Sequence, residues 1–191
     1  MGVAADVGRE QDIERLVEAT VEHFGRIDLF VSNAGIAIDG GLDTTAEQWR
    51  KIIDLNLMSQ VHAARHAVSH MLAQGGGYLL NVASAAGLLV IFDTVSHTVT
   101  KHASIGFTEW LAATYEDQGI GVSVLCPAAV RTAILAGKYD TPEGGRDAIT
   151  TDELADIVVK GLAEERFRSP PTPGCWSASR SRPATTTSTS T

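Results

Sequence analysis

The sequence predicts an α/β protein in which helices cover both faces of a parallel β-sheet. Short apolar runs alternate along the chain with longer segments whose apolar residues recur every three or four positions, as in helices. The run at 78–83 is nearly all apolar, which is typical of a strand covered on both faces. Strands that alternate with helices form βαβ units, so we expect the strands to run parallel.

After an apolar opening at residues 3–5, the predicted elements are a helix over 13–24, a strand over 27–31, a helix over 45–71, a strand over 78–83, a helix over 103–111 that ends near Gly119, a strand over 120–126 and a helix over 154–162. Gly25 is expected to end the first helix in a left-handed conformation. Thr44 with Glu47, and Thr150 with Glu153, have the spacing of capping boxes and predict two helix starts.

The last part of the chain differs from the rest in composition. From Arg166 onward prolines lie among serines, threonines and arginines, and no apolar period continues. Such a segment cannot bury enough apolar surface to offset its conformational entropy. We therefore predict one domain over residues 1–167, no strand after Leu162, and a disordered Pro/Ser/Thr-rich tail over 168–191.

Composition excludes several classes of function. The net charge is -8 with no cluster of lysines or arginines, which argues against a nucleic-acid partner. No apolar run is long enough to span a membrane, and the first residues do not resemble a secretion signal. The two cysteines, Cys126 and Cys175, form neither a disulfide framework nor a metal site. A cytoplasmic protein without a metal is the expectation.

Several polar residues either come directly after a predicted strand or lie on the apolar face of a predicted helix. Ser84 comes directly after a strand, where ligands bind in open parallel sheets, although many such serines only cap a turn. Asn56 lies on the apolar face of its helix, and alone it is best interpreted as a core amide with hydrogen-bond partners. His97 and Lys101 are four residues apart, so they share a helix face.

Together these segments resemble the short-chain dehydrogenase/reductase family over residues 2 to about 167. The segments that carry the resemblance are Asp6-Val7, Asn33-Ala34-Gly35, Asn56-Leu57, the stretch from Asn81 to Gly87, the stretch from Thr100 to Ala103, and Leu125-Cys126-Pro127. The resemblance implies a Rossmann-like fold, NAD or NADP as cofactor, a small-molecule alcohol/ketone pair as substrate, and a homo-oligomer.

The resemblance also implies a role for each matching residue. Asn56, Ser84 and Lys101 match the family's catalytic asparagine, serine and lysine. The positions that match cofactor-binding residues are Asp6, Val7, Asn33, Ala34, Gly35, Lys101, Val130 and Thr132. His97 stands where the family has its catalytic tyrosine, four residues before Lys101 and thirteen after Ser84. Imidazole reaches roughly 2 Å less far than a phenol, and about 1 Å of misplacement can cost ~100-fold in rate.

The sequence differs from the family pattern at His97 and also at its amino end. The family's first two strands and its glycine-rich turn belong before Asp6, and this sequence does not contain them. We expect weak binding of NAD(P), turnover below that of the family, and an exposed apolar edge at 29–31 unless residues 3–5 pair with it.

Three interpretations follow from these features. The first is an NAD(P)-dependent oxidoreductase with impaired activity, and the second is a non-catalytic fragment or pseudoenzyme that acts by association. The third is another doubly wound protein, such as a phosphate-sensing domain, which the spacing from Ser84 to Lys101 disfavours.

Overall fold

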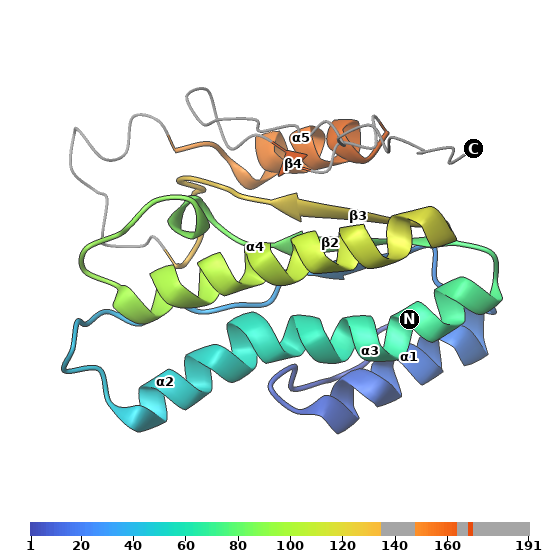
Figure 1. Ribbon diagram of the computed structural model, residues 1–191, viewed down its shortest axis with the longest axis horizontal. Helices are drawn as coiled ribbons and strands as arrows, with labels where there is room; N and C mark the ends of the chain where they lie inside the picture. The colour runs from blue at the N-terminus through green and yellow to red at the C-terminus, as the bar shows by residue number, and fades with distance from the viewer. Residues whose placement is uncertain (135–147, 164–167, 170–191) are drawn as a thin grey trace, which may run out of the picture.

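The computed structural model describes residues 1–134, 148–163 and 168–169. In chain order the elements are α1 (Glu10–Phe24), β1 (Leu29–Ser32), α2 (Ala46–Ile53), the π-helix η1 (Asp54–Met58), α3 (Ser59–Ala73), β2 (Gly77–Val82), the short helix η2 (Ala85–Gly87), α4 (Val95–Tyr115), η3 (Glu116–Gln118), β3 (Ile120–Leu125), α5 (Thr151–Ala163) and β4 (Arg168–Ser169). Figure 1 shows α1 and α3 side by side, α4 in front of the strands, and α5 beside β4.

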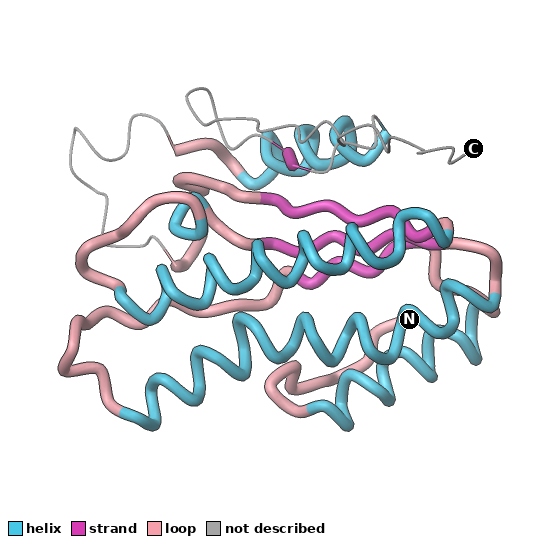
Figure 2. The backbone as a smooth tube through the Cα atoms, in the orientation of Figure 1, coloured by secondary structure: helices cyan, strands magenta, loops and turns pink. Residues whose placement is uncertain are grey.

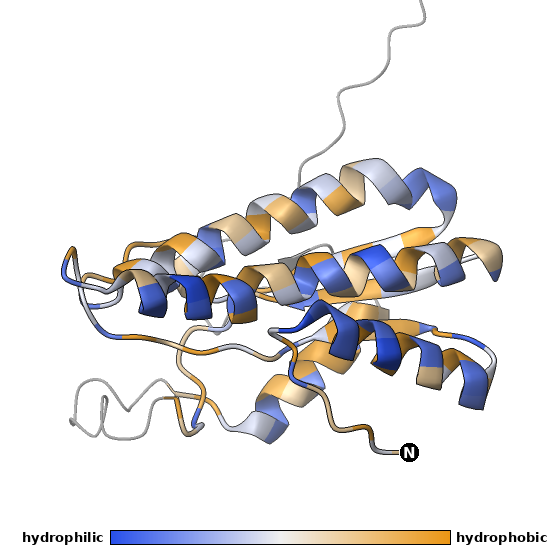
Figure 3. Ribbon diagram, turned by 90° about the horizontal axis from the view of Figure 1, so that it is seen from below, coloured by the Kyte–Doolittle hydropathy of each residue, from blue (hydrophilic) through white to orange (hydrophobic). Residues whose placement is uncertain are grey.

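The sheet is parallel, with the strand order β1-β2-β3-β4 (Figure 2). In the view from below, the strands lie between two helical layers (Figure 3). The α/β class with a parallel sheet is therefore confirmed. Because consecutive strands point the same way, their carboxyl ends meet at one edge of the sheet, and the segments that follow them gather there.

The main core lies between one face of the sheet and helices α1, α3 and α4. Its buried members include Leu79 of β2, Val122 of β3, Met71 of α3 and Leu111 of α4. Side chains in a strand alternate between faces, so Leu79 and Val122, which are paired in register, point to the same helical layer. This core holds the strands and α4 in fixed positions beneath the carboxyl-terminal edge.

The other face of the sheet is covered unevenly. Leu80 and Leu125 on this face are only 2% and 3% exposed, whereas Leu29 and Val31 of β1 are 42% and 45% exposed. Within the described residues β1 pairs only with β2. The exposed apolar edge that the sequence predicts is therefore present at Leu29 and Val31.

The structure differs from the sequence-based prediction at both ends of the sheet. Residues 1–6 form no strand, so the apolar opening at 3–5 neither continues the sheet nor pairs with β1. Conversely, Arg168–Ser169 pairs with β3 as a short strand, although no strand was expected after Leu162. Two residues cannot display a hydrophobic period, so periodicity could not predict β4. The remainder of the predicted tail, residues 170–191, lies outside the described residues.

Helix boundaries follow local hydrogen bonding. Gly25 ends α1 with a φ of 78°, the left-handed conformation that glycine adopts without strain, as expected. The capping box of α2 is formed by Thr45 and Gln48, not by Thr44 and Glu47. The hydroxyl of Thr44 instead donates to the carbonyl of Gly41 at 2.9 Å, within the loop that precedes the helix.

The second capping box is as predicted. Thr150 Oγ1 accepts a hydrogen bond from the backbone N–H of Glu153, and the carboxylate of Glu153 accepts one from the backbone N–H of Thr150. These bonds lower the pKa of the Glu153 carboxyl, because they favour its charged form. Helix α5 therefore begins where the sequence indicates.

Candidate functional site

The site begins where a helix changes its hydrogen-bond pattern. Between α2 and α3 the chain makes a π-helical turn over Asp54–Met58, which widens the helix and redirects its side chains. Asn56 sits in this turn and is fully buried. Its Oδ1 accepts from the N–H of Ile36 at 2.8 Å, and its Nδ2 donates to the carbonyl of Ile36 at 2.9 Å and to Thr100 Oγ1 at 3.2 Å. Asn56 thus joins three segments.

The side chain of Lys101, on α4, extends toward the end of β2 and the turn at Gly35, close to Asn56. It is 5% exposed, and its Nζ donates to the carbonyl of Val82, the last residue of β2, at 2.9 Å. Burial lowers the pKa of the Lys101 amino group from 10.5 to about 8, while the charge of nearby Cys126 acts in the opposite direction. A buried lysine with a lowered pKa at the end of a strand is typical of a functional site.

Gly35 makes this close approach possible. A Cβ atom at this position would lie 3.1 Å from Oδ1 of Asn56 and 3.5 Å from Nζ of Lys101. The first distance is tighter than an ordinary van der Waals contact, so a larger residue would displace the amide. The turn after β1 therefore packs directly on Asn56 and Lys101.

His97 lies one turn before Lys101 on α4. Its Nδ1 is 3.1 Å from the carbonyl oxygen of Ile36. A carbonyl can only accept, so we assign the Nδ1 proton to this bond, which leaves Nε2 as the atom able to exchange a proton. Asn56 and His97 therefore share one acceptor, the carbonyl of Ile36.

Ser84 lies two residues after the end of β2 and caps η2. Its Oγ accepts a hydrogen bond from the N–H of Ala86 at 3.1 Å. The turn lies close to α4: a Cβ on Gly87 would come within 2.6 Å of the carbonyl oxygen of Lys101. The structure therefore brings Asn56, His97 and Lys101 around the 35–36 turn, with Ser84 two residues beyond the carbonyl that Lys101 contacts.

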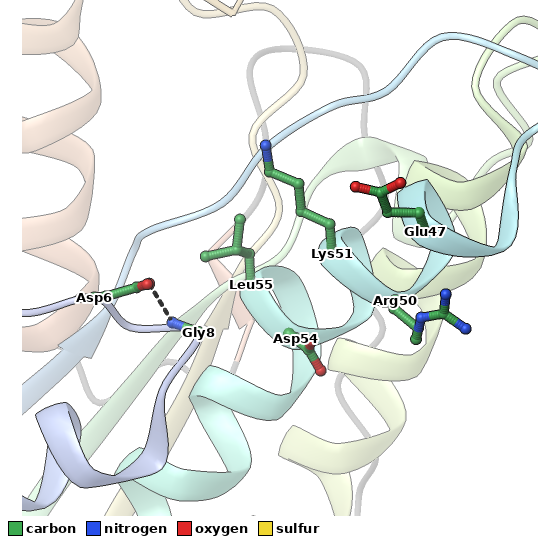
Figure 4. A pocket seen from close by; sticks show the side chains of 7 residues that line it. All are labelled: Asp6, Gly8, Glu47, Arg50, Lys51, Asp54 and Leu55. Atoms are coloured by element: carbon green, nitrogen blue, oxygen red, sulfur yellow. Dashed lines mark hydrogen bonds between the residues drawn. The ribbon is translucent and has the colours of Figure 1, made fainter.

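A pocket of about 420 Å³ adjoins this site on the side of the chain's first residues. Its lining residues are Asp6, Gly8, Glu47, Arg50, Lys51, Asp54 and Leu55 (Figure 4). Asp6 is exposed, and its Oδ1 accepts from the N–H of Gly8 at 3.0 Å. Three acidic and two basic side chains line the pocket together with the apolar side chain of Leu55.

The remaining predicted cofactor positions lie along the same edge. Val7 is half-buried beside Asp6, and Asn33 and Ala34 are exposed directly after β1. Beyond β3, Val130 is 9% exposed and forms a bridge with Ile149, while Thr132 is exposed. The loop after β3 is thus held at the sheet edge, and the roles of all these residues remain predictions.

Sequence reasoning missed two participants, the backbone of Ile36 and the hydroxyl of Thr100. Ile36 acts through its backbone, which carries no sequence signal. Thr100 could have been suspected from its position, because it directly precedes Lys101 and lies three residues after His97 on the same helix. The structure shows that it is buried. In residues 1–134, 148–163 and 168–169, no group of histidine, cysteine or acidic residues is placed to hold a metal ion. No helix in these ranges is long and apolar enough to cross a membrane.

Comparison with known proteins gives these features a context. The family model of short chain dehydrogenases matches residues 1–143. An uncharacterised oxidoreductase of Thermotoga maritima is 39% identical over 156 residues, which are 81% of this chain and 62% of that protein. The 2-(R)-hydroxypropyl-CoM dehydrogenase of Xanthobacter autotrophicus is 36% identical over 145 residues, 74% of this chain and 58% of its own length. The chain thus spans about three fifths of these relatives.

Solved structures agree with the sequence comparison. The crystal structure of a short chain dehydrogenase/reductase from Burkholderia phymatum in complex with NAD superposes with a TM-score of 0.78 at 27% identity, covering 88% of this chain and 69% of that one. The family model covers well over half of the chain, and the relatives match the stretch that carries Asn56, Ser84 and Lys101. The chain belongs to the short chain dehydrogenase family of oxidoreductases.

Proposed function

We propose that this site serves NAD(P)-linked hydride transfer between an alcohol and a ketone, with His97 in the proton-transfer position and with a slow proton step. The observation that carries the proposal is the convergence of Asn56, His97 and Lys101 on the 35–36 turn at the carboxyl ends of the strands. Ser84 completes the set from the end of β2.

The residues of the pocket fit one end of a dinucleotide. A carboxylate at Asp6 suits an exocyclic amino group, and Leu55 and Gly8 offer a shallow apolar contact for a flat ring. Lys101 would donate to the ribose hydroxyls near the nicotinamide, with Asn33, Ala34, Gly35, Val130 and Thr132 along the same edge. When bound, NAD or NADP supplies or accepts the hydride.

The chain's own residues would handle the substrate oxygen and its proton. Ser84 Oγ would hold the oxygen. The unprotonated Nε2 of His97 would take the proton from the alcohol during oxidation, and the imidazolium form, protonated on both nitrogens, would return it from Nε2 during reduction. The charge on Lys101 would stabilise developing negative charge on that oxygen. The ring of His97 is held by its Nδ1 on Ile36, so it cannot move toward the substrate without breaking that bond. We expect a slow proton step because imidazole reaches roughly 2 Å less far than the phenol of the family's tyrosine.

The test combines a cofactor titration with three variants of the full chain. NAD and NADP are titrated by calorimetry, and turnover of a panel of secondary alcohols and ketones is followed by NAD(P)H absorbance. We expect slow turnover that Ser84→Ala abolishes and that His97→Tyr alone does not bring to a family-like rate, because weak cofactor binding limits the reaction as well as the proton step. Lys101→Met should weaken cofactor binding.

The alternative is a non-catalytic protein that acts by association. The same titration separates the two proposals. No heat of binding with either cofactor, and no turnover before or after His97→Tyr, would favour association. A homo-oligomer remains part of both proposals, through the long helices over 45–72 and 95–117 that the family resemblance indicates.

A further inference from the structure

Helix α4 carries buried hydroxyl side chains at every fourth position. These residues are Ser96, Thr100, Ser104 and Thr108, and each is at most 1% exposed. Three of them contact a side-chain amide on a neighbouring element: Thr100 with Asn56, Ser104 with Gln60, and Thr108 with Asn81. A polar stripe therefore runs along the buried face of α4, and Thr100 is the member that touches the candidate site.

Counting donors and acceptors shows what Thr100 does for Asn56. The amide of Asn56 has two N–H donors, and they go to the carbonyl of Ile36 and to Thr100 Oγ1. Its oxygen accepts from the N–H of Ile36. Asn56 is fully buried, so without Thr100 one of its N–H groups would have neither protein nor solvent as a partner.

The hydroxyl of Thr100 also fixes which way the amide faces. Its single proton is directed at the carbonyl of Ser96 at 2.9 Å or that of His97 at 3.1 Å. Toward Asn56 the hydroxyl can therefore only accept. An amide turned by 180° would place Oδ1 against the Thr100 oxygen and Nδ2 against the N–H of Ile36, two repulsive contacts.

We propose that Thr100 is a positioning residue for the proton-transfer step, which rests on the proposed function of this site. Thr100 holds the amide of Asn56, Asn56 holds both backbone groups of Ile36, and the carbonyl of Ile36 holds Nδ1 of His97. Through this chain of bonds Thr100 fixes the His97 tautomer in which Nε2 is the atom that exchanges a proton. Thr100 itself touches neither substrate nor cofactor.

The experiment compares Thr100→Val with a matched control in the full chain. Thr108 has the same environment: it is fully buried, donates to the carbonyl four residues earlier at 2.7 Å, and accepts from an amide, Asn81 Nδ2, at 2.9 Å. Thr108→Val therefore removes an equivalent pair of hydrogen bonds away from His97. Thr100→Ser keeps the hydroxyl and serves as the conservative rescue.

The primary measurement is the tautomer of the His97 ring, read from its ¹⁵N chemical shifts and assigned by comparison with His97→Asn. In the parent, Thr108→Val and Thr100→Ser, we expect the proton on Nδ1. In Thr100→Val we expect the ratio of the two tautomers to shift by about fivefold or more toward Nε2, because losing a buried partner releases the amide of Asn56. Where alcohols are turned over, kcat should fall by about tenfold with little change in KM.

Each outcome decides the proposal. A parental His97 tautomer in Thr100→Val, or an equal change in Thr108→Val, overturns the positioning role, since a purely structural effect would not distinguish the two threonines. The tautomer is measured without cofactor or substrate. An absence of turnover in every variant therefore counts against the proposed function, while the ¹⁵N shifts still decide the role of Thr100.

Discussion

The two halves of α4 are buried against very different surroundings. The carboxyl-terminal half carries Leu111 and Ala112 into the main apolar core, against Met71 and Ile120. The amino-terminal half buries Thr100 and Lys101 together with other polar side chains. One continuous helix therefore runs from a region that stabilises the fold into a region that carries the candidate site.

This difference indicates how the site is maintained. Burying an amino group such as that of Lys101 costs free energy, because the charged form loses its hydration. The second cluster of buried apolar residues among the described residues packs against α4 through Ile105 and has four members, Ala83, Ile105, Val124 and Cys126. So small a cluster offsets little of that cost, and the main core has to supply the rest. The predictions below test this division, from the largest expected effect to the smallest.

The largest effect is expected in the main core. Leu111 is 2% exposed, and Leu111→Ala should lower the free energy of unfolding by about 2–5 kcal/mol, through lost burial and the cavity left behind. Urea denaturation measures the loss. The ¹⁵N shifts of His97 should stay unchanged in the fraction that remains folded. A large change in those shifts would mean that the two halves of α4 are not separable.

The next largest change in the free energy of unfolding is expected to be an increase. Lys101→Met should raise the free energy of unfolding at pH 7, because it removes a buried charge. The pKa of Lys101 is lowered from 10.5 to about 8 in the fold, so the unfolded chain binds more protons between these values. Stability of the parent therefore rises with pH across this window, by up to about 3 kcal/mol, and the penalty is fully present below pH 8.

Denaturation of both proteins at pH 7 and at pH 10 checks this sign. The advantage of Lys101→Met should shrink at the higher pH, where Lys101 is mostly neutral. The lost hydrogen bond to Val82 reduces the gain at pH 7 by about 1 kcal/mol. A variant that is less stable than the parent at both pH values would show that burial of Lys101 is not costly.

The fold could largely be predicted from the sequence, because the signals that matter are periodic. Apolar spacing predicts the helices and the parallel strands, and the position of Ser84 after β2 follows from the same pattern. The burial of Asn56 also followed from its place on an apolar helix face. These features depend on which face a residue occupies, and sequence spacing determines that.

The detailed site could not be predicted in the same way. The π-turn at Asp54–Met58 changes hydrogen bonding without changing composition, and the shared carbonyl of Ile36 belongs to the backbone. The start of α2 was misplaced by one residue, because two adjacent threonines offer the same hydroxyl and only the loop geometry selects Thr45. The sequence thus places residues on faces, and the structure decides which atoms meet.

Two glycines of the α4 region give a smaller, sharper test. Gly87→Ala should lower the free energy of unfolding by about 1–3 kcal/mol, because its Cβ would lie 2.6 Å from the backbone oxygen of Lys101. Gly106→Ala is the control, since no atom lies within 4 Å of a Cβ there and alanine favours a helix by about 1 kcal/mol. Thermal denaturation should therefore show opposite shifts. Equal shifts would contradict the close contact between η2 and α4.

The smallest effect on stability is expected at the exposed edge of the sheet, where neither half of α4 contributes. Val31→Lys should change the free energy of unfolding by no more than about 0.5 kcal/mol, because the side chain is 45% exposed. Its effect should appear in self-association instead. Within the described residues β1 has one neighbouring strand, and an apolar strand with a free edge can pair with another chain. A lysine there opposes such pairing by charge and hydration.

Trp110→Lys separates this edge from the helical route. Trp110 is 56% exposed on α4, one of the helices through which we propose a homo-oligomer. Sedimentation velocity over a range of concentrations should show fewer large, non-specific species for Val31→Lys and loss of a discrete oligomer for Trp110→Lys. A single monomeric boundary for the parent at high concentration would contradict both routes. Equal loss of all larger species in both variants would mean that one interface includes the sheet edge and α4 together.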